Sequence, residues 1–130
     1  MIEVYIDAAT KGNPGPSGAG IVLKGEGILL EYSFFIGNMN NHEAEFYVLV
    51  KALELCYEKQ FSIVSLRTDS KIVADSIEKQ YVKNKDFKPY LDRALPIINQ
   101  FQLFFIKWIP ESQNKHADHL ARQGIHKDKS

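Results

Sequence analysis

Apolar side chains repeat with two different periods along this chain of 130 residues, and the change falls near residue 42. Before that point they alternate with polar ones, as in Ile2–Asp7, and a period of two indicates half-buried strands. Two more apolar runs follow at residues 19–23 and 28–36, separated by glycine-rich turns. The pattern predicts an antiparallel meander of three strands, the first of which ends at Asp7.

From residue 42 to about residue 58 the apolar period becomes 3.6, which predicts a helix. Its apolar face carries Leu49, Leu53 and Cys56. Glu45 lies on the same face, so we expect an acidic side chain that points toward the core. A buried carboxylate is unfavourable unless something compensates its charge, which makes Glu45 a candidate for function.

Two further strands and three helices are expected in the rest of the chain. The fourth strand covers residues 63–68 and ends in Asp69. The fifth covers residues 101–109, and its nearly continuous apolar character predicts burial on both faces. The expected helices are residues 70–80, residues 90–99 with Pro96 at a kink or boundary, and a last helix that begins after Asn114 as a candidate N-cap.

The size and composition of the chain indicate one soluble domain. With 130 residues and 45% hydrophobic side chains, it has room for a single core. We assign residues 1–125 to that domain and residues 126–130 to a polar C-terminal tail. A lone cysteine, Cys56, excludes an internal disulfide framework, and no apolar run is long enough to cross a bilayer. We therefore expect a cytoplasmic protein that acts as a monomer away from membranes.

Charge is distributed unevenly, although the formal net charge is +0. Residues 1–78 carry more acidic than basic side chains, whereas residues 79–93 are rich in lysine. This polarity suits a protein that binds cations beside a phosphate chain, but a solvated surface segment has the same composition. The basic residues of the segment are Lys79, Lys83, Lys85, Lys88 and Arg93.

Three acids occupy positions where a core or strand end is expected: Asp7, Glu45 and Asp69. Each could have a purely structural role, because acids at strand ends and helix starts often cap backbone amides; the same holds for Asp118. If they converge, two carboxylates about 5 Å apart repel by roughly 3 kcal/mol. Such a cluster requires a cation, and an all-oxygen ligand set selects Mg²⁺ or Mn²⁺ over zinc.

Five segments of the chain, in this order, resemble the motifs of the type 1 ribonuclease H family. The resemblance spans nearly the whole chain, and five motifs in the right order are far more specific than a single glycine-rich turn. Within the family, the segments Glu43–Phe46 and Phe105–Pro110 are most similar to the compact ribonuclease HI-like proteins of Bacillus and its relatives. The five segments are Tyr5–Asp7, Gly12–Gly20, Asn40–Phe46, Thr68–Ser70 and Asn114–Ala121.

The resemblance implies an α/β fold in which helices flank a five-stranded mixed sheet of three antiparallel and two parallel strands. It also implies a metal site formed by Asp7, Glu45, Asp69 and Asp118, with two Mg²⁺ or Mn²⁺ ions. Asp7 would bridge the ions, Glu45 and Asp69 would complete the site of one, and Asp118 would hold the other. The implied reaction is hydrolysis of the RNA strand of RNA/DNA hybrids, giving 5′-phosphate and 3′-hydroxyl ends.

The same resemblance suggests which residues bind the hybrid. Asn13 and Asn41 match positions that contact the minor groove, where an amide can bond the 2′-OH of RNA. Asn40 lies where relatives contact a DNA phosphate, and His42 replaces the usual second asparagine. Turn formation and helix capping are the structural alternatives for the asparagines. The remaining candidate contacts are Gly12, Ser70, Lys83, Lys85, Lys88 and Asn114.

One departure from the family keeps a second function open. Well-studied members carry a histidine in a loop about ten residues before the last aspartate, and that position falls on Trp108 here. The alternative is therefore a ribonuclease H-like nucleic-acid-binding or regulatory module with little or no cleavage. Trp108 itself, with its neighbouring phenylalanines, is expected in the core because it lies on the fifth strand.

Overall fold

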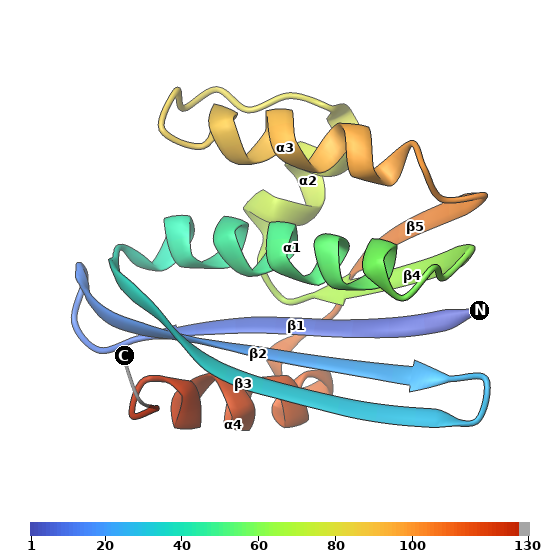
Figure 1. Ribbon diagram of the computed structural model, residues 1–130. Coiled ribbons are helices and arrows are strands. Elements are labelled where there is room, and N and C mark those ends of the chain that lie inside the picture. Colours follow the sequence, from blue (N-terminus) through green and yellow to red (C-terminus); the bar gives the residue numbers. More distant parts are fainter. Residues whose placement is uncertain (128–130) are drawn as a thin grey trace.

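A single five-stranded sheet organises the protein, whose computed structural model describes residues 1–127 (Figure 1). The strands lie in the order β3-β2-β1-β4-β5. The first three pair antiparallel, whereas β4 pairs parallel with both β1 and β5. The predicted mixed sheet is confirmed. The strands are β1 (Ile2–Thr10), β2 (Gly15–Gly25), β3 (Ile28–Met39), β4 (Ile63–Thr68) and β5 (Leu103–Trp108).

Helices cover both faces of this sheet. On one face α1 packs against β1 and β2, and α3 packs on the outer side of α1; α4 covers β1, β2 and β3 on the other face (Figure 1). The layers follow from the apolar periods, since Ile2, Val4 and Ile6 of β1 are all fully buried. The helices are α1 (Asn41–Glu58), α2 (Lys71–Lys79), α3 (Lys88–Ile98) and α4 (Lys115–Gly124), with a short 3₁₀ turn at Glu111–Gln113.

Close contact between α4 and the sheet depends on a glycine. Gly20 of β2 is the partner of Asp7 in the β1–β2 register. A Cβ atom at Gly20 would lie 2.0 Å from the carbonyl oxygen of Ala117, so no other residue allows α4 this close. Because Asp118 follows Ala117, this contact brings its helix next to the end of β1.

The fifth strand differs from its predicted environment. It runs over Leu103–Trp108 at the edge of the sheet, and its exposure alternates. Leu103, Phe105 and Trp108 are each about half exposed, at 49%, 51% and 47%. The prediction that this segment is buried on both faces is wrong, because α4 packs on β1–β3 and does not extend across β5.

Helix boundaries lie within two residues of the predicted ones. α3 begins at Lys88, two residues earlier than expected, and continues through the exposed Pro96, which has no N–H to donate to the preceding turn of the helix. α4 ends at Gly124, and residues 128–130 of the predicted polar tail lie outside the described residues. None of the described helices has the length and apolar character that crossing a membrane requires.

Candidate functional site

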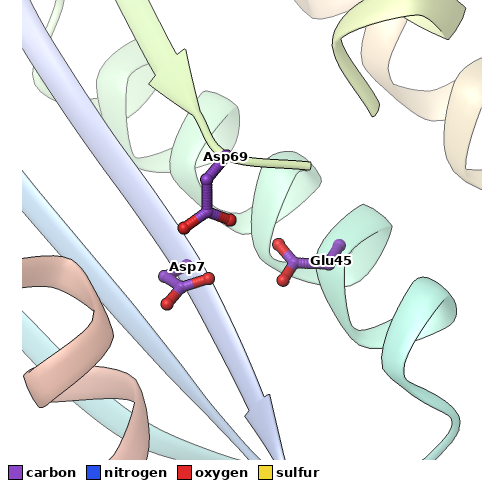
Figure 2. Close-up of side chains that lie close together, drawn as sticks. All are labelled: Asp7, Glu45 and Asp69. Carbon is purple, nitrogen blue, oxygen red and sulfur yellow. The ribbon is translucent and has the colours of Figure 1, made fainter. Parts of the chain in front are cut away.

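Three carboxylates meet at one end of the sheet. Asp7 lies on β1, Asp69 directly follows β4, and Glu45 projects from α1 toward both (Figure 2). One oxygen from each lies within 4.8 Å of the others. Parallel pairing of β1 with β4 explains this, because it brings the carboxyl ends of two strands that are distant in sequence to the same edge.

Negative charge on the carboxylates of this cluster is unfavourable. Within residues 1–127, none of the three carboxylates forms an ion pair with a lysine, arginine or histidine. Burial, and then the charge of Asp69, raises the pKa of Asp7 to about 8. Burial and the charge of Asp7 also hold the pKa of Glu45 well above its usual range. The three acids therefore lack a positive partner of the protein's own.

This donor set fits a divalent cation. Oε2 of Glu45 is buried and has no hydrogen-bond partner among residues 1–127, and such an orphaned oxygen is costly unless a ligand satisfies it. All the donors are carboxylate oxygens, the ligands that Mg²⁺ and Mn²⁺ prefer. Among the described residues, Asp7, Glu45 and Asp69 can accordingly hold a metal ion.

Asp118 lies beside this group but does not belong to its closest set. A hydrogen bond between Asp118 and Asp7, together with the charge of Asp118, adds to the rise in the pKa of Asp7. The Asp118 carboxylate also forms an ion pair of 3.1 Å with Arg122, one helical turn further along α4. The four acids predicted from the sequence are thus neighbours, and the Asp118 carboxylate is also paired with Arg122.

Residues around Asp69 include two that sequence reasoning placed elsewhere. Trp108 was expected in the core, but its half-exposed indole donates a hydrogen bond of 3.1 Å to the carbonyl oxygen of Asp69. Asn114 was expected at the substrate surface, but it is 1% exposed and donates to Oδ2 of Asp69. Alternation along the strand could not have placed Trp108 at a surface, because Trp108 shares a strand face with the partly buried Phe104 and Ile106.

The predicted asparagine contacts gather beside the acids, at the start of α1. The Oδ1 atom of Asn13, in the exposed loop that contains Gly12, accepts a hydrogen bond of 3.1 Å from the backbone N–H of Asn41. Asn40 caps α1 through a bond from the N–H of Glu43, as the structural alternative proposed. Ser70 likewise caps α2 by accepting from the N–H of Val73. Asn13, Asn40 and Ser70 therefore each form a hydrogen bond within the protein itself.

A groove of about 880 Å³, here called the lysine groove, lies between the start of α1 and the segment after α2. It contains two of the predicted contacts, His42 and Lys83. The predicted Lys85 and Lys88 lie outside its lining, and Lys88 is paired instead with Asp92 at 2.9 Å. Its lining residues are His42, Lys71, Ile72, Asp75, Ser76, Lys79, Tyr81, Val82, Lys83, Asn84 and Phe87.

Comparisons with known proteins agree with this architecture. A family model described as reverse transcriptase-like matches residues 5–124. The protein EbsB of Enterococcus faecalis is 47% identical over 129 residues, which cover 98% of this chain and 96% of EbsB.

Two solved structures are similar over most of their length. The RNase H1 of the archaeon Halobacterium salinarum has a TM-score of 0.88 and 32% identity, with 95% of this chain and 96% of that chain covered. The chain spans 64% of the full length of that organism's ribonuclease HI. LC11-RNase H1, solved in complex with an RNA/DNA hybrid, has a TM-score of 0.87 and 30% identity, with 96% of each chain covered.

Proposed function

The chain belongs to the type 1 ribonuclease H family, and on that premise we propose that it hydrolyses the RNA strand of RNA/DNA hybrids as a metal-dependent endoribonuclease. The observation that carries this proposal is the convergence of Asp7, Glu45 and Asp69 within 4.8 Å. Acids so placed, without a cationic side chain beside them, destabilise a protein unless a bound cation compensates their repulsion. An active site for divalent metal chemistry accounts for that arrangement.

The proposed roles of the acids follow from their positions. Asp7 lies close enough to Asp69 and Asp118 for both charges to raise its pKa, so it would hold two Mg²⁺ or Mn²⁺ ions, with Glu45 and Asp69 holding one of them and Asp118 the other. The chemistry that such ions supply is activation of water for in-line attack and stabilisation of the leaving oxygen, which gives 5′-phosphate and 3′-hydroxyl ends.

The proposed substrate contacts lie on both sides of the acid cluster. Asn13 and Asn41 are exposed and adjacent, so their amides can bond the 2′-hydroxyls that distinguish RNA from DNA. The lysine groove offers cations together with the exposed ring of Tyr81, a combination that suits binding along a nucleic-acid backbone. We propose that the groove takes the DNA strand, with Lys79 and Lys83 facing its phosphates.

The test is cleavage of a labelled RNA/DNA hybrid by the purified protein with Mg²⁺ or Mn²⁺, beside double-stranded RNA and double-stranded DNA of the same sequence. We expect cuts in the RNA strand of the hybrid alone, and none after removal of divalent ions with a chelator. Asp7→Asn should abolish cleavage while hybrid binding persists. Equal cleavage by Asp7→Asn would contradict the assignment of the site.

One observation favours a second function, a hybrid-binding module that does not cleave. Arg122 pairs with the Asp118 carboxylate and so competes for one of the proposed metal ligands. The same assay separates the two functions, because a module binds the hybrid with either metal and leaves the RNA intact. Arg122→Ala should raise the cleavage rate if this pair limits metal binding.

We propose that the protein is located in the cytoplasm. The single thiol of Cys56 is buried and free, as a reducing compartment such as the cytoplasm favours. We propose a monomer, which light scattering of the purified protein can check.

A further inference from the structure

Two side chains donate hydrogen bonds to Asp69, one from the end of β5 and one from the residue before α4. The indole Nε1–H of Trp108 donates to its backbone carbonyl at 3.1 Å. The Nδ2 amide of Asn114 donates to its carboxylate oxygen Oδ2 at 3.3 Å. Trp108 is the last residue of β5 and Asn114 directly precedes α4, so the two ends of one short connection restrain the main chain and the side chain of the same acid.

The Asn114 side chain also reaches the strand that carries Asp7. Its Nδ2 donates to the carbonyl oxygen of Ile6 at 2.8 Å, one residue before Asp7. The carbonyl oxygen of Asn114 accepts from the N–H of Asp118 at 3.0 Å and so starts α4. One buried residue therefore links the three chain segments that bring Asp7, Asp69 and Asp118 together.

The position of Asn114 is unusual for the residue that precedes a helix. An asparagine there normally turns its side-chain oxygen to the first N–H groups of the helix. Asn114 makes no such bond, and its Oδ1 is buried without a partner. The Asn114 side chain thus does not cap α4 and its Oδ1 accepts no hydrogen bond, but its Nδ2 donates to β1 and to Asp69.

We propose that Asn114 and Trp108 are positioning residues that hold Asp69 in the orientation in which it binds a divalent cation. This inference rests on the proposed function, because it concerns the same acids. It replaces the sequence-based prediction that Asn114 contacts substrate, since a side chain 1% exposed cannot reach a hybrid at the surface. Outer partners of metal ligands typically change metal affinity or activity by about 10–100-fold when removed.

The first experiment measures cation binding without any substrate. Trp108 is the only tryptophan of the chain, so its fluorescence reports on its bond with Asp69 during a Mg²⁺ titration. We expect an emission change in the wild type, its loss in Asp69→Asn, and about 10–100-fold weaker Mg²⁺ affinity in Asn114→Ala.

Asn114→Asp keeps the shape of the side chain and loses the amide donor, so it should weaken Mg²⁺ binding as well. Gln113→Ala, at the exposed neighbouring position, is the matched control and should bind Mg²⁺ as the wild type does.

Trp108→Phe is the variant that keeps the test decisive if substitutions at the buried Asn114 unfold the protein. It keeps an aromatic ring at an exposed position and removes only the N–H donor. Calorimetry should then show Mg²⁺ affinity several-fold below the wild type, with the thermal midpoint of the metal-free protein unchanged. Unchanged Mg²⁺ affinity in Trp108→Phe would overturn the role of Trp108.

Kinetics of hybrid cleavage separate positioning from substrate contact. A positioning role predicts that Asn114→Ala lowers kcat at limiting Mg²⁺, that saturating Mg²⁺ restores much of it, and that KM for the hybrid stays near the wild-type value. A raised KM with normal Mg²⁺ affinity would overturn the proposal and return Asn114 to the substrate contacts. If the wild type binds Mg²⁺ but cleaves nothing, the proposed function fails while the titrations still decide the role of Asn114.

Discussion

The acid cluster and the lysine groove are neighbouring charged regions that are built in opposite ways. Asp7, Glu45 and Asp69 come from β1, α1 and the end of β4; Asp7 is buried and the other two are partly buried. The lysines that line the groove all come from residues 71–83 and are exposed. Solvated lysines neither destabilise the fold nor need a partner, whereas the buried acids need one. A functional assignment is therefore stronger for the acids than for the lysines.

The largest expected effect comes from neutralising an acid of the cluster. Glu45→Gln preserves the size of the side chain and removes the charge next to the buried Asp7, so cleavage of a hybrid should fall by at least about 100-fold. Glu58→Gln, at the exposed far end of the same helix, is the control and should cleave normally. Comparable activity in the two variants would show that Glu45 matters no more for cleavage than an exposed acid on the same helix.

A second prediction concerns stability without metal. In the folded protein Asp7 keeps its proton up to a pKa of about 8, whereas the unfolded chain releases it near its ordinary value of 3.8. The folded state binds more protons between these values, so the free energy of unfolding should fall as the pH rises from about 4 to 8. Asp7→Asn removes this contribution and should be more stable than the wild type at pH 8, by on the order of a few kcal/mol, and no more stable near pH 4.

Chemical denaturation at several pH values, in the presence of a chelator, measures this effect. Added Mg²⁺ should stabilise the wild type at pH 8 and leave Asp7→Asn almost unchanged, because a ligand of the folded state alone shifts the unfolding equilibrium. A wild type that gains stability between pH 4 and 8 would show that the acids have a positive partner of their own.

The lysine groove should respond more weakly and mainly through salt. Replacing both Lys79 and Lys83 with alanine should reduce the slope of log affinity against log salt by about two, since each phosphate contact contributes roughly one. The rate of the chemical step at saturating hybrid should stay unchanged. Fluorescence anisotropy over a range of NaCl concentrations gives the slope, and a slope equal to that of the wild type would place the DNA strand elsewhere.

The smallest effect is expected at Lys88, which lies outside the groove lining. Its exposed pair with Asp92 spans one helical turn of α3, and such pairs contribute about 0.3–0.5 kcal/mol. Lys88→Ala should change the free energy of unfolding by no more than that and leave the salt slope of hybrid binding intact. A lowered slope in this variant would extend the nucleic-acid surface beyond the groove and weaken the contrast with the acid cluster.

Local patterns in the sequence predicted much of the fold. The alternation over Ile2–Asp7 and the helical period after residue 42 correctly predicted β1 and α1, including the inward position of Glu45, but β1 continues past its predicted end at Asp7 to Thr10. The apolar run of the fifth strand misled the prediction, because a run of Leu and Phe looks the same in a central strand and in an edge strand. Which face of β5 is exposed depends on where α4 packs on the sheet, and no pattern within the β5 sequence predicts that.

The amino-acid sequence by itself determined the order of strands and helices, the family resemblance and the acids that could form a metal site, because hydrophobic period and motif are properties of neighbouring residues. Only the tertiary structure decided that Trp108 is a donor to Asp69, that Asn114 turns away from its helix, and that Arg122 shares Asp118. The bonds of Trp108 and Asn114 join residues far apart in the chain, and the Arg122 pair depends on rotamers. Strand pairing and the close approach of α4 at Gly20 set the environment in which all three form.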